Sequence, residues 1–442
     1  MRPNRNLPSV RAWSVGPVLA ALAAGIVLGV GRASTGGEES ADAPAFQLSP
    51  DLPHDVFAPI PGATGFQSPM DSLSWQTFVA LCWPASPVAN GVPDRDYVIG
   101  GQPVGGYYPK GMPSSPTVWE TYKDSREAIT DSSTPPTPFS TKAVHVLSDV
   151  TVPFTNSPLV DQNGKPVYYE VRLNETEFDY IVANKLYDPA ATHPPVSFPS
   201  GSNVTADVGS IHLKAAWKIL AGPETAHPDD PARFYTAQAV IQDGATSHPA
   251  TVALVGLHIA HKTASRPQWI WSTFEQVDNA PNLLPRETPI TPGAYSFCNP
   301  SCAATACPPN QPVAPGSTTP VQVLRVTPIE PDAAPLNRQW QQALRSWNAK
   351  TVWQYYQLVS TQWPAEPANV KGLGMPQPTF LANTTLETFF QGPTVGKPSP
   401  QNPPHSCIGC HGMFALRRDF LFQLPRSEGD PALPDKVSDR TR

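Results

Sequence analysis

The chain has 442 residues, of which 56 are proline, and only 15% are charged. Proline removes a backbone donor and clashes inside a helix, so this density excludes long uninterrupted helices, coiled coils and helical solenoids. Hydrophobic residues make up 40% of the chain and exclude wholesale disorder, while 30 basic and 36 acidic residues without a basic cluster give no electrostatic support for nucleic-acid binding.

The N-terminus has the layout of an export signal. Three arginines precede an apolar run over residues 13–31, and small residues follow. We therefore predict a signal peptide at residues 1–33 and a periplasmic or secreted protein. The alternative is an uncleaved inner-membrane anchor, because a run of about nineteen apolar residues can also span a bilayer.

The first helix is predicted just after a Pro/Gly-containing arm. Ser72 is a suitable N-cap, and Pro84 ends the run. The apolar residues between them recur at helical spacing and are Trp75, Phe78, Val79 and Cys82. A second short helix is predicted over residues 119–129.

The middle of the chain changes to the alternating period of strands. Strands are predicted over residues 167–173, 211–219, 234–241, 251–260, 269–274 and 321–326. Asn174 caps a helix between the first two, with Glu177 three residues on. Consecutive strands of this kind indicate an α+β fold whose body is an antiparallel β-sheet or sandwich with short flanking helices.

The C-terminal third returns to helical patterns, over residues 337–347, 352–363 and 384–391. We therefore predict that the β-rich body is followed by a C-terminal helical segment. The predicted organisation is a signal peptide or anchor (1–33), an arm (34–70), a β-rich body (71–335), the C-terminal helical segment (336–425) and a disordered tail (426–442).

One motif carries recognisable chemistry. Cys407 and Cys410 are three apart, and His411 follows at once. This is the attachment signal for c-type haem: the two sulfurs bond the vinyl groups of the porphyrin, and the imidazole becomes an axial iron ligand. Two other interpretations are a redox dithiol and a zinc site, although a dithiol belongs early in a βα unit and a zinc site needs a second ligand pair.

The second axial position has histidine candidates. Only 31 residues follow His411, and their one methionine, Met413, is too close to reach the opposite side of the ring. His258 and His261 lie in the most apolar predicted strand. We predict that one of them lies near the haem, as sixth ligand or distal residue; the alternative is a histidine satisfied within the core.

The other four cysteines are Cys82, Cys298, Cys302 and Cys307. In an exported protein they predict up to two disulfides, with three possible connectivities. A bond within the loop that holds the last three is one expectation. Cys82 faces the predicted core, where it can bond to that loop or remain a buried thiol.

Several blocks resemble those of exported bacterial cytochrome c-like proteins. They lie at residues 74–78 (SWQTF), 169–174 (YEVRLN), 178–181, 214–217 (KAAW), 256–259, 262–263, 269–275 (WIWSTFE) and 383–387 (NTTLE). The resemblance implies one covalently attached haem near the C-terminus and no assigned reaction. It carries over the haem-binding residues Cys407, Cys410 and His411, and no sixth ligand.

The leading functional hypothesis is an exported mono-haem c-type protein that passes single electrons to a redox partner protein. The alternative is a haem enzyme or a small-ligand or redox sensor with an open sixth iron position, in which the β body forms a pocket. A third possibility is a carbohydrate- or partner-binding module, since Trp269 and Trp271 lie near Glu275 and Asp278.

Overall fold

The computed structural model describes residues 48–56, 67–96, 98–99, 102–103, 116–283, 295–399 and 402–425. The predicted signal peptide, much of the arm and the C-terminal tail lie outside these residues. Phe46–Arg442 form one compact unit, so the predicted β-rich body and the C-terminal segment fold together. None of the helices in the described ranges is long and apolar enough to cross a membrane.

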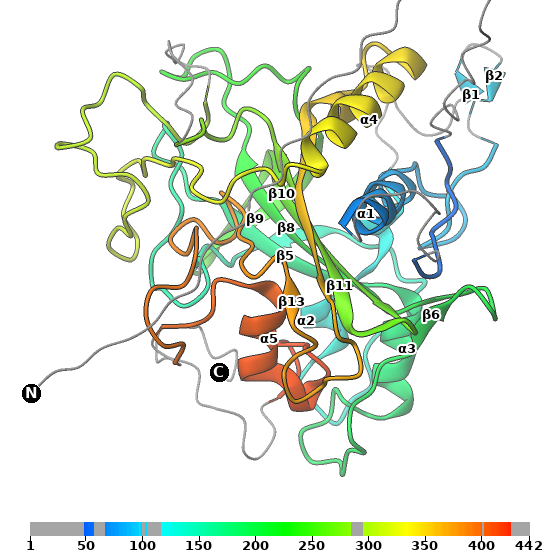
Figure 1. The fold of residues 1–442 in the computed structure, drawn as a ribbon. Coiled ribbons are helices and arrows are strands. Elements are labelled where there is room, and N and C mark those ends of the chain that lie inside the picture. Colours follow the sequence, from blue (N-terminus) through cyan, green and yellow to red (C-terminus); the bar gives the residue numbers. More distant parts are fainter. Residues whose placement is uncertain are drawn as a thin grey trace, which may run out of the picture. The chain divides into compact units, whose positions relative to one another are not determined.

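An eleven-stranded, mainly antiparallel sheet dominates the described part of this unit (Figure 1). Its main path runs in the order β13 (Pro376–Gln377), β12 (Tyr356–Pro364), β11 (Arg266–Gln276), β10 (Thr246–Thr263), β8 (Ile211–Ile219), β5 (Tyr168–Leu173) and β3 (Lys123–Asp124). This confirms the predicted α+β class with an antiparallel sheet.

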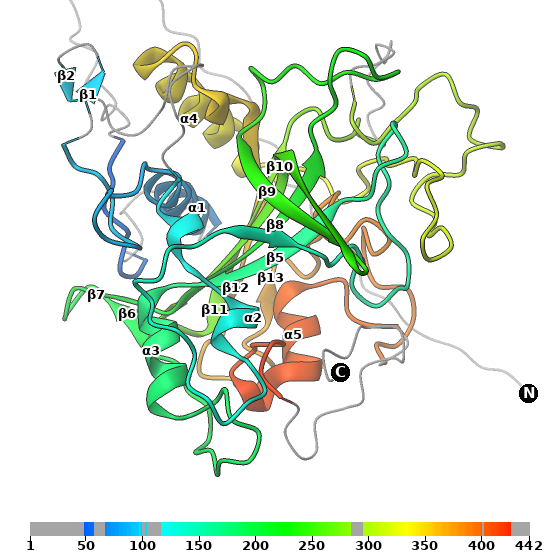
Figure 2. The ribbon, with the colours of Figure 1, turned by 180° about the vertical axis from the view of Figure 1, so that it is seen from behind.

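The remaining strands lie beside this path. They are β4 (His145–Leu147), β6 (Ser200–Ser202), β7 (Asp207–Gly209) and β9 (Thr236–Asp243). Strands β9 and β10 form an antiparallel hairpin, which the view from behind shows (Figure 2). The pairs β4–β9 and β6–β10 are parallel. A separate two-stranded sheet contains β1 (Val98–Ile99) and β2 (Gln102–Pro103).

The helices are short, as the proline content requires. They are α1 (Gln67–Leu81), α2 (Ser125–Ala128), α3 (Glu175–Ala183), α4 (Ala333–Trp347) and α5 (Cys407–Ala415), with 3₁₀ turns at Trp119–Thr121, Val352–Tyr355 and Leu416–Arg418. The predicted cap of α3 is confirmed, because the Asn174 side chain accepts a hydrogen bond from the backbone of Glu177 at 3.0 Å. Helix α1 begins before the predicted cap Ser72, since Pro69 is tolerated in a first helical turn.

The C-terminal segment is less helical than predicted. The expected helix over residues 352–363 is a 3₁₀ turn followed by β12, which pairs with β11. Its alternating, aromatic and β-branched sequence suits a strand once a neighbouring edge is present. Three other expectations were also wrong. Residues 119–129 split into a 3₁₀ turn, β3 and α2; residues 384–391 form turns; and residues 321–326 contain one isolated bridge.

Helices cover both faces of the sheet. Helices α1 and α4 pack on one face, where Trp75 contacts Phe274 and Ser74 bonds to Ser272. Helix α5 lies against β11 and β12 on the other face (Figure 1), where His411 contacts Trp271. Successive strand residues point to opposite faces of the sheet, so Ser272 contacts α1 while Trp271 contacts α5.

The cysteine prediction is resolved in part within one loop. Cys302 and Cys307 form a disulfide, five residues apart in the sequence. Cys82 and Cys298 are buried thiols. No disulfide joins Cys82 to this loop. The prediction of such a disulfide was therefore wrong, and the alternative prediction of a buried thiol at Cys82 is confirmed.

A buried carboxyl on α1 makes stability depend on pH. Asp71 is fully buried, and its Oδ1 accepts hydrogen bonds from Gln67 and from the backbone of Thr361, while Oδ2 has no partner. Burial raises its pKa from 3.8 to about 7. The folded state therefore holds a proton that the unfolded chain releases, and stability falls as pH rises between these values.

We expect Asp71→Asn to stabilise the protein increasingly between about pH 5 and pH 8, by roughly 2 to 3 kcal/mol over that interval. The measurement is the free energy of urea unfolding at both pH values. Asp51→Asn, at an exposed aspartate, is the control and should show almost no pH-dependent difference. An equal effect of Asp71→Asn at both pH values would contradict the prediction.

Candidate functional site

The Cys-x-x-Cys-His motif, Cys407 to His411, forms the first turns of α5. The Ser406 hydroxyl caps the helix by accepting a hydrogen bond from the backbone of Gly409 at 3.1 Å. Gln362 of β12 fastens the same turn to the sheet, because its Oε1 accepts hydrogen bonds from Ser406 Oγ at 3.0 Å and from the backbone N–H of Ile408 at 2.8 Å. The buried Ile408 side chain completes this anchor. The motif therefore has a defined position on the sheet.

Between α5 and the sheet lies a cavity of about 440 Å³. All three residues of the motif, Cys407, Cys410 and His411, line it. The facing wall comes from alternate residues of four strands, namely Tyr169, Val171, His212, Lys214, His258 and Trp271. This volume and mixed lining are typical of ligand and cofactor sites.

One hydrogen bond and two aromatic contacts fix the orientation of the His411 ring. Its Nδ1–H donates to the carbonyl of Phe420 at 2.7 Å, and its ring packs against Trp271 and Phe422, with centroids 4.4 and 4.5 Å away. Burial lowers its pKa to about 3, so the ring is neutral. A hydrogen bond at Nδ1 selects the tautomer whose Nε2 has a lone pair for a metal.

The two motif cysteines are unlike a reactive dithiol. Burial raises the pKa of both Cys407 and Cys410, and the nearby Glu387 carboxylate raises both further. Redox dithiols require a lowered thiol pKa, because the thiolate is the nucleophile. In the described part of the chain, no three His, Cys, Asp or Glu side chains form a metal-binding cluster either. The donor set suits thioether attachment better than a dithiol or a zinc site.

The structure separates the two candidate histidines. His258 lines the cavity, with its Nε2 at 3.2 Å from Oε2 of Glu387. His261 points to the opposite face, where its Nε2–H donates to the carbonyl of Val208 at 2.6 Å. Burial raises the pKa of Glu387, but His258, Lys214 and the backbone N–H of Asn383 together lower it overall. His258 is therefore engaged with a carboxylate inside the cavity.

Other functional candidates were missed from the sequence. His212 and Lys214 line the cavity beside His258, and Glu387 lies in a turn that was predicted as helix. Strand alternation put His212 and Lys214 on one face of their strand, but only the register pairs Lys214 with His258 and His212 with Ala260. None of the methionines in the described ranges lines the cavity.

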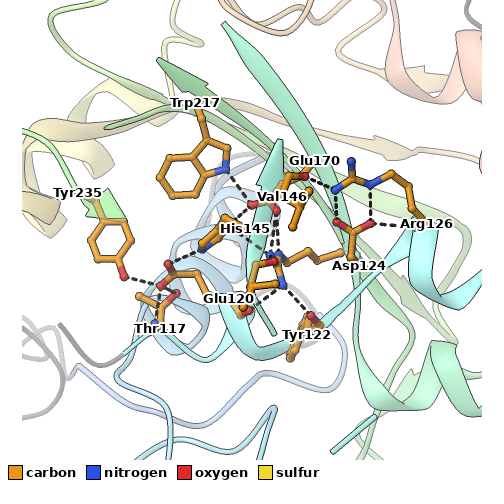
Figure 3. A network of polar contacts seen from close by, with 12 residues as sticks. Thr117, Glu120, Tyr122, Asp124, Arg126, His145, Val146, Glu170, Trp217 and Tyr235 are labelled. Atoms are coloured by element: carbon orange, nitrogen blue, oxygen red, sulfur yellow. Dashed lines mark hydrogen bonds and ion pairs between the residues drawn. The ribbon is translucent and has the colours of Figure 1, made fainter. Parts of the chain in front are cut away.

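A second buried polar cluster surrounds His145 (Figure 3). His145 bridges two carboxylates, with Nδ1 at 2.8 Å from Glu170 and Nε2 at 2.9 Å from Glu120. Burial lowers the pKa of His145, yet Glu170 and Glu120 raise it overall to about 9. Arg172 supplies the second cation, and Trp217 Nε1–H donates to Glu170 at 2.8 Å. Two cations thus balance two carboxylates.

The residues behind the carbohydrate-binding hypothesis have structural partners. Trp269 is fully buried, and Trp271 packs against His411 in the cavity wall. Glu275 pairs with Arg325 at 2.5 Å, and Asp278 pairs with Arg233 at 2.5 Å. We infer that these residues stabilise the sheet.

The chain matches no protein-family model, no curated protein and no solved structure.

Proposed function

We propose that the protein is an exported mono-haem c-type cytochrome-like protein that transfers single electrons. The observation that carries the proposal is the arrangement of the motif: Cys407, Cys410 and His411 share one cavity, and Nδ1 of His411 is bonded to a carbonyl. The haem would be held by thioether bonds to both cysteines, with His411 as an axial ligand.

The cavity residues fit such a group. When bound, the haem supplies a one-electron redox centre. The hydrogen bond from His411 to the Phe420 carbonyl fixes the ring orientation and increases its basicity as a ligand. Trp271 and Phe422 pack on the imidazole and exclude water from it, which lowers the polarity that surrounds the iron ligand.

Export and a protein partner belong to this proposal. The Cys302–Cys307 disulfide suits an oxidising compartment, in agreement with the predicted signal peptide at residues 1–33 and with anchoring by residues 13–31 as the alternative. A haem that transfers electrons requires a docking partner, so we expect a redox protein in the same compartment.

A second candidate function is a haem enzyme or sensor with an open sixth position. It is favoured by the contact of His258 with Glu387, because an imidazole whose Nε2 faces a carboxylate can act as a distal residue and leave iron accessible.

The test is a visible spectrum of the full chain exported in a host with haem-attachment machinery. We expect haem absorbance that stays with the polypeptide after denaturation and organic extraction. If the haem is extracted completely, the proposal fails. Carbon monoxide then separates the two functions: no binding to the reduced protein supports electron transfer, whereas immediate binding supports the open site.

A further inference from the structure

Four histidines line the cavity: His212, His258, His405 and His411. His212 of β8 lines the cavity, and its Nδ1 lies 3.4 Å from Oε1 of Glu177 on α3. Its ring packs between two tryptophans, with centroids 4.7 Å from Trp269 and 5.8 Å from Trp271. Trp271 also contacts His411. The two imidazoles therefore pack around the same indole.

Glu177 needs the imidazole as a hydrogen-bond donor. Its side chain is completely buried, and neither carboxylate oxygen accepts a hydrogen bond from the described residues. His212 Nδ1 is likewise buried without a hydrogen-bond partner at the present geometry. Burying a carboxylate without a hydrogen-bond donor costs free energy, so we place the ring proton of His212 on Nδ1, where it can be donated to Glu177. That tautomer leaves the lone pair on Nε2.

The imidazole rings of His212 and His411 thus have the same hydrogen-bonding arrangement. Each directs Nδ1 to an oxygen acceptor, Glu177 in one case and the Phe420 carbonyl in the other. His258 differs, because its carboxylate contact uses Nε2.

We propose that His212, oriented by Glu177, is the second axial ligand of the haem iron. The inference rests on the proposed function and extends it, since two imidazole ligands give a closed, low-spin centre suited to electron transfer. A carboxylate that accepts the Nδ1–H of a metal-bound histidine fixes the ring and raises its basicity. Glu177 is then a positioning residue that acts through His212.

The first test replaces His212 in the full-length holoprotein. His212→Gln keeps a polar side chain of similar size between the tryptophans, and its fold is checked by circular dichroism. We expect the oxidised spectrum and its paramagnetic resonance to change from low spin to high spin, and the reduced protein to bind carbon monoxide. Added imidazole should restore the low-spin spectrum.

Three matched variants make this test specific. His261→Gln lies on the opposite face and should leave the low-spin spectrum unchanged. His258→Gln and His405→Gln each remove a rival imidazole of the cavity, and both should also leave the iron with two ligands. If His258→Gln or His405→Gln produces the high-spin form while His212→Gln does not, or if the wild type already binds carbon monoxide, the inference is wrong. Loss of covalent haem would instead overturn the proposed function.

The second test addresses Glu177. Glu177→Gln removes the negative charge beside Nδ1, so we expect the low-spin spectrum to persist while the midpoint potential rises, because a less basic imidazole stabilises ferric iron less. Glu177→Asp should recover part of the shift. Glu175→Gln, at an exposed position of the same helix, is the control. Equal potentials in all variants would contradict the positioning role.

Discussion

Replacing Cys407 and Cys410 together by serine is expected to abolish covalent haem attachment. Both sulfurs line the cavity beside His411, and serine cannot form a thioether with a vinyl group. The measurement is haem absorbance on the denatured, extracted polypeptide. Each single variant should keep one thioether, with a shifted absorption maximum because one vinyl group remains unsaturated.

The other cysteines provide the control. The double variant Cys302→Ser and Cys307→Ser removes the disulfide from a loop that does not line the cavity, and it should retain the full haem content. If the Cys407 and Cys410 double variant keeps haem after denaturation, attachment occurs elsewhere and the proposed function is wrong.

Replacing Arg172 by methionine is expected to destabilise the protein by about 3 to 5 kcal/mol, because removal of one member of a buried ion pair leaves an uncompensated charge. Arg172 is 1% exposed and donates to Glu170 Oε2 at 2.9 Å. It also donates to the carbonyls of Glu120, Tyr122 and Val144. Burial raises the pKa of Glu170, but Arg172 and His145 together lower it overall.

A neighbouring arginine in the same network is the matched control (Figure 3). Arg126 pairs with Asp124 at 2.6 Å but is 26% exposed. Water can therefore compensate for its loss, and Arg126→Met should cost about 1 kcal/mol or less. Both are measured by urea unfolding. Similar losses in the two variants would show that burial does not determine the contribution of the network.

This network also supports the cavity. Glu170 lies between Tyr169 and Val171 on β5, and all three residues line the cavity. Because one strand carries both sets of side chains, the buried ion pairs hold the cavity wall in place. Arg172→Met should therefore lower the temperature at which the visible spectrum of the haem-loaded protein begins to change.

Some of the site could be predicted from local patterns. The Cys-x-x-Cys-His spacing is contained in five consecutive residues, and its three functional side chains do share one cavity. Strand alternation could also have separated the two candidate histidines. His258 and His261 are three residues apart on β10, so they lie on opposite faces of the sheet and only one of them can face the cavity.

By itself, the sequence determined the motif, the mixed fold class with its antiparallel sheet, and most strands between residues 167 and 276, because each depends on spacing within a short segment. Only the tertiary structure decided that residues 356–364 join the sheet, that His212 faces the motif, and that Glu177 and Glu387 reach two imidazoles. These outcomes depend on register and on contacts between distant segments, and local periodicity carries no information about which strands become neighbours.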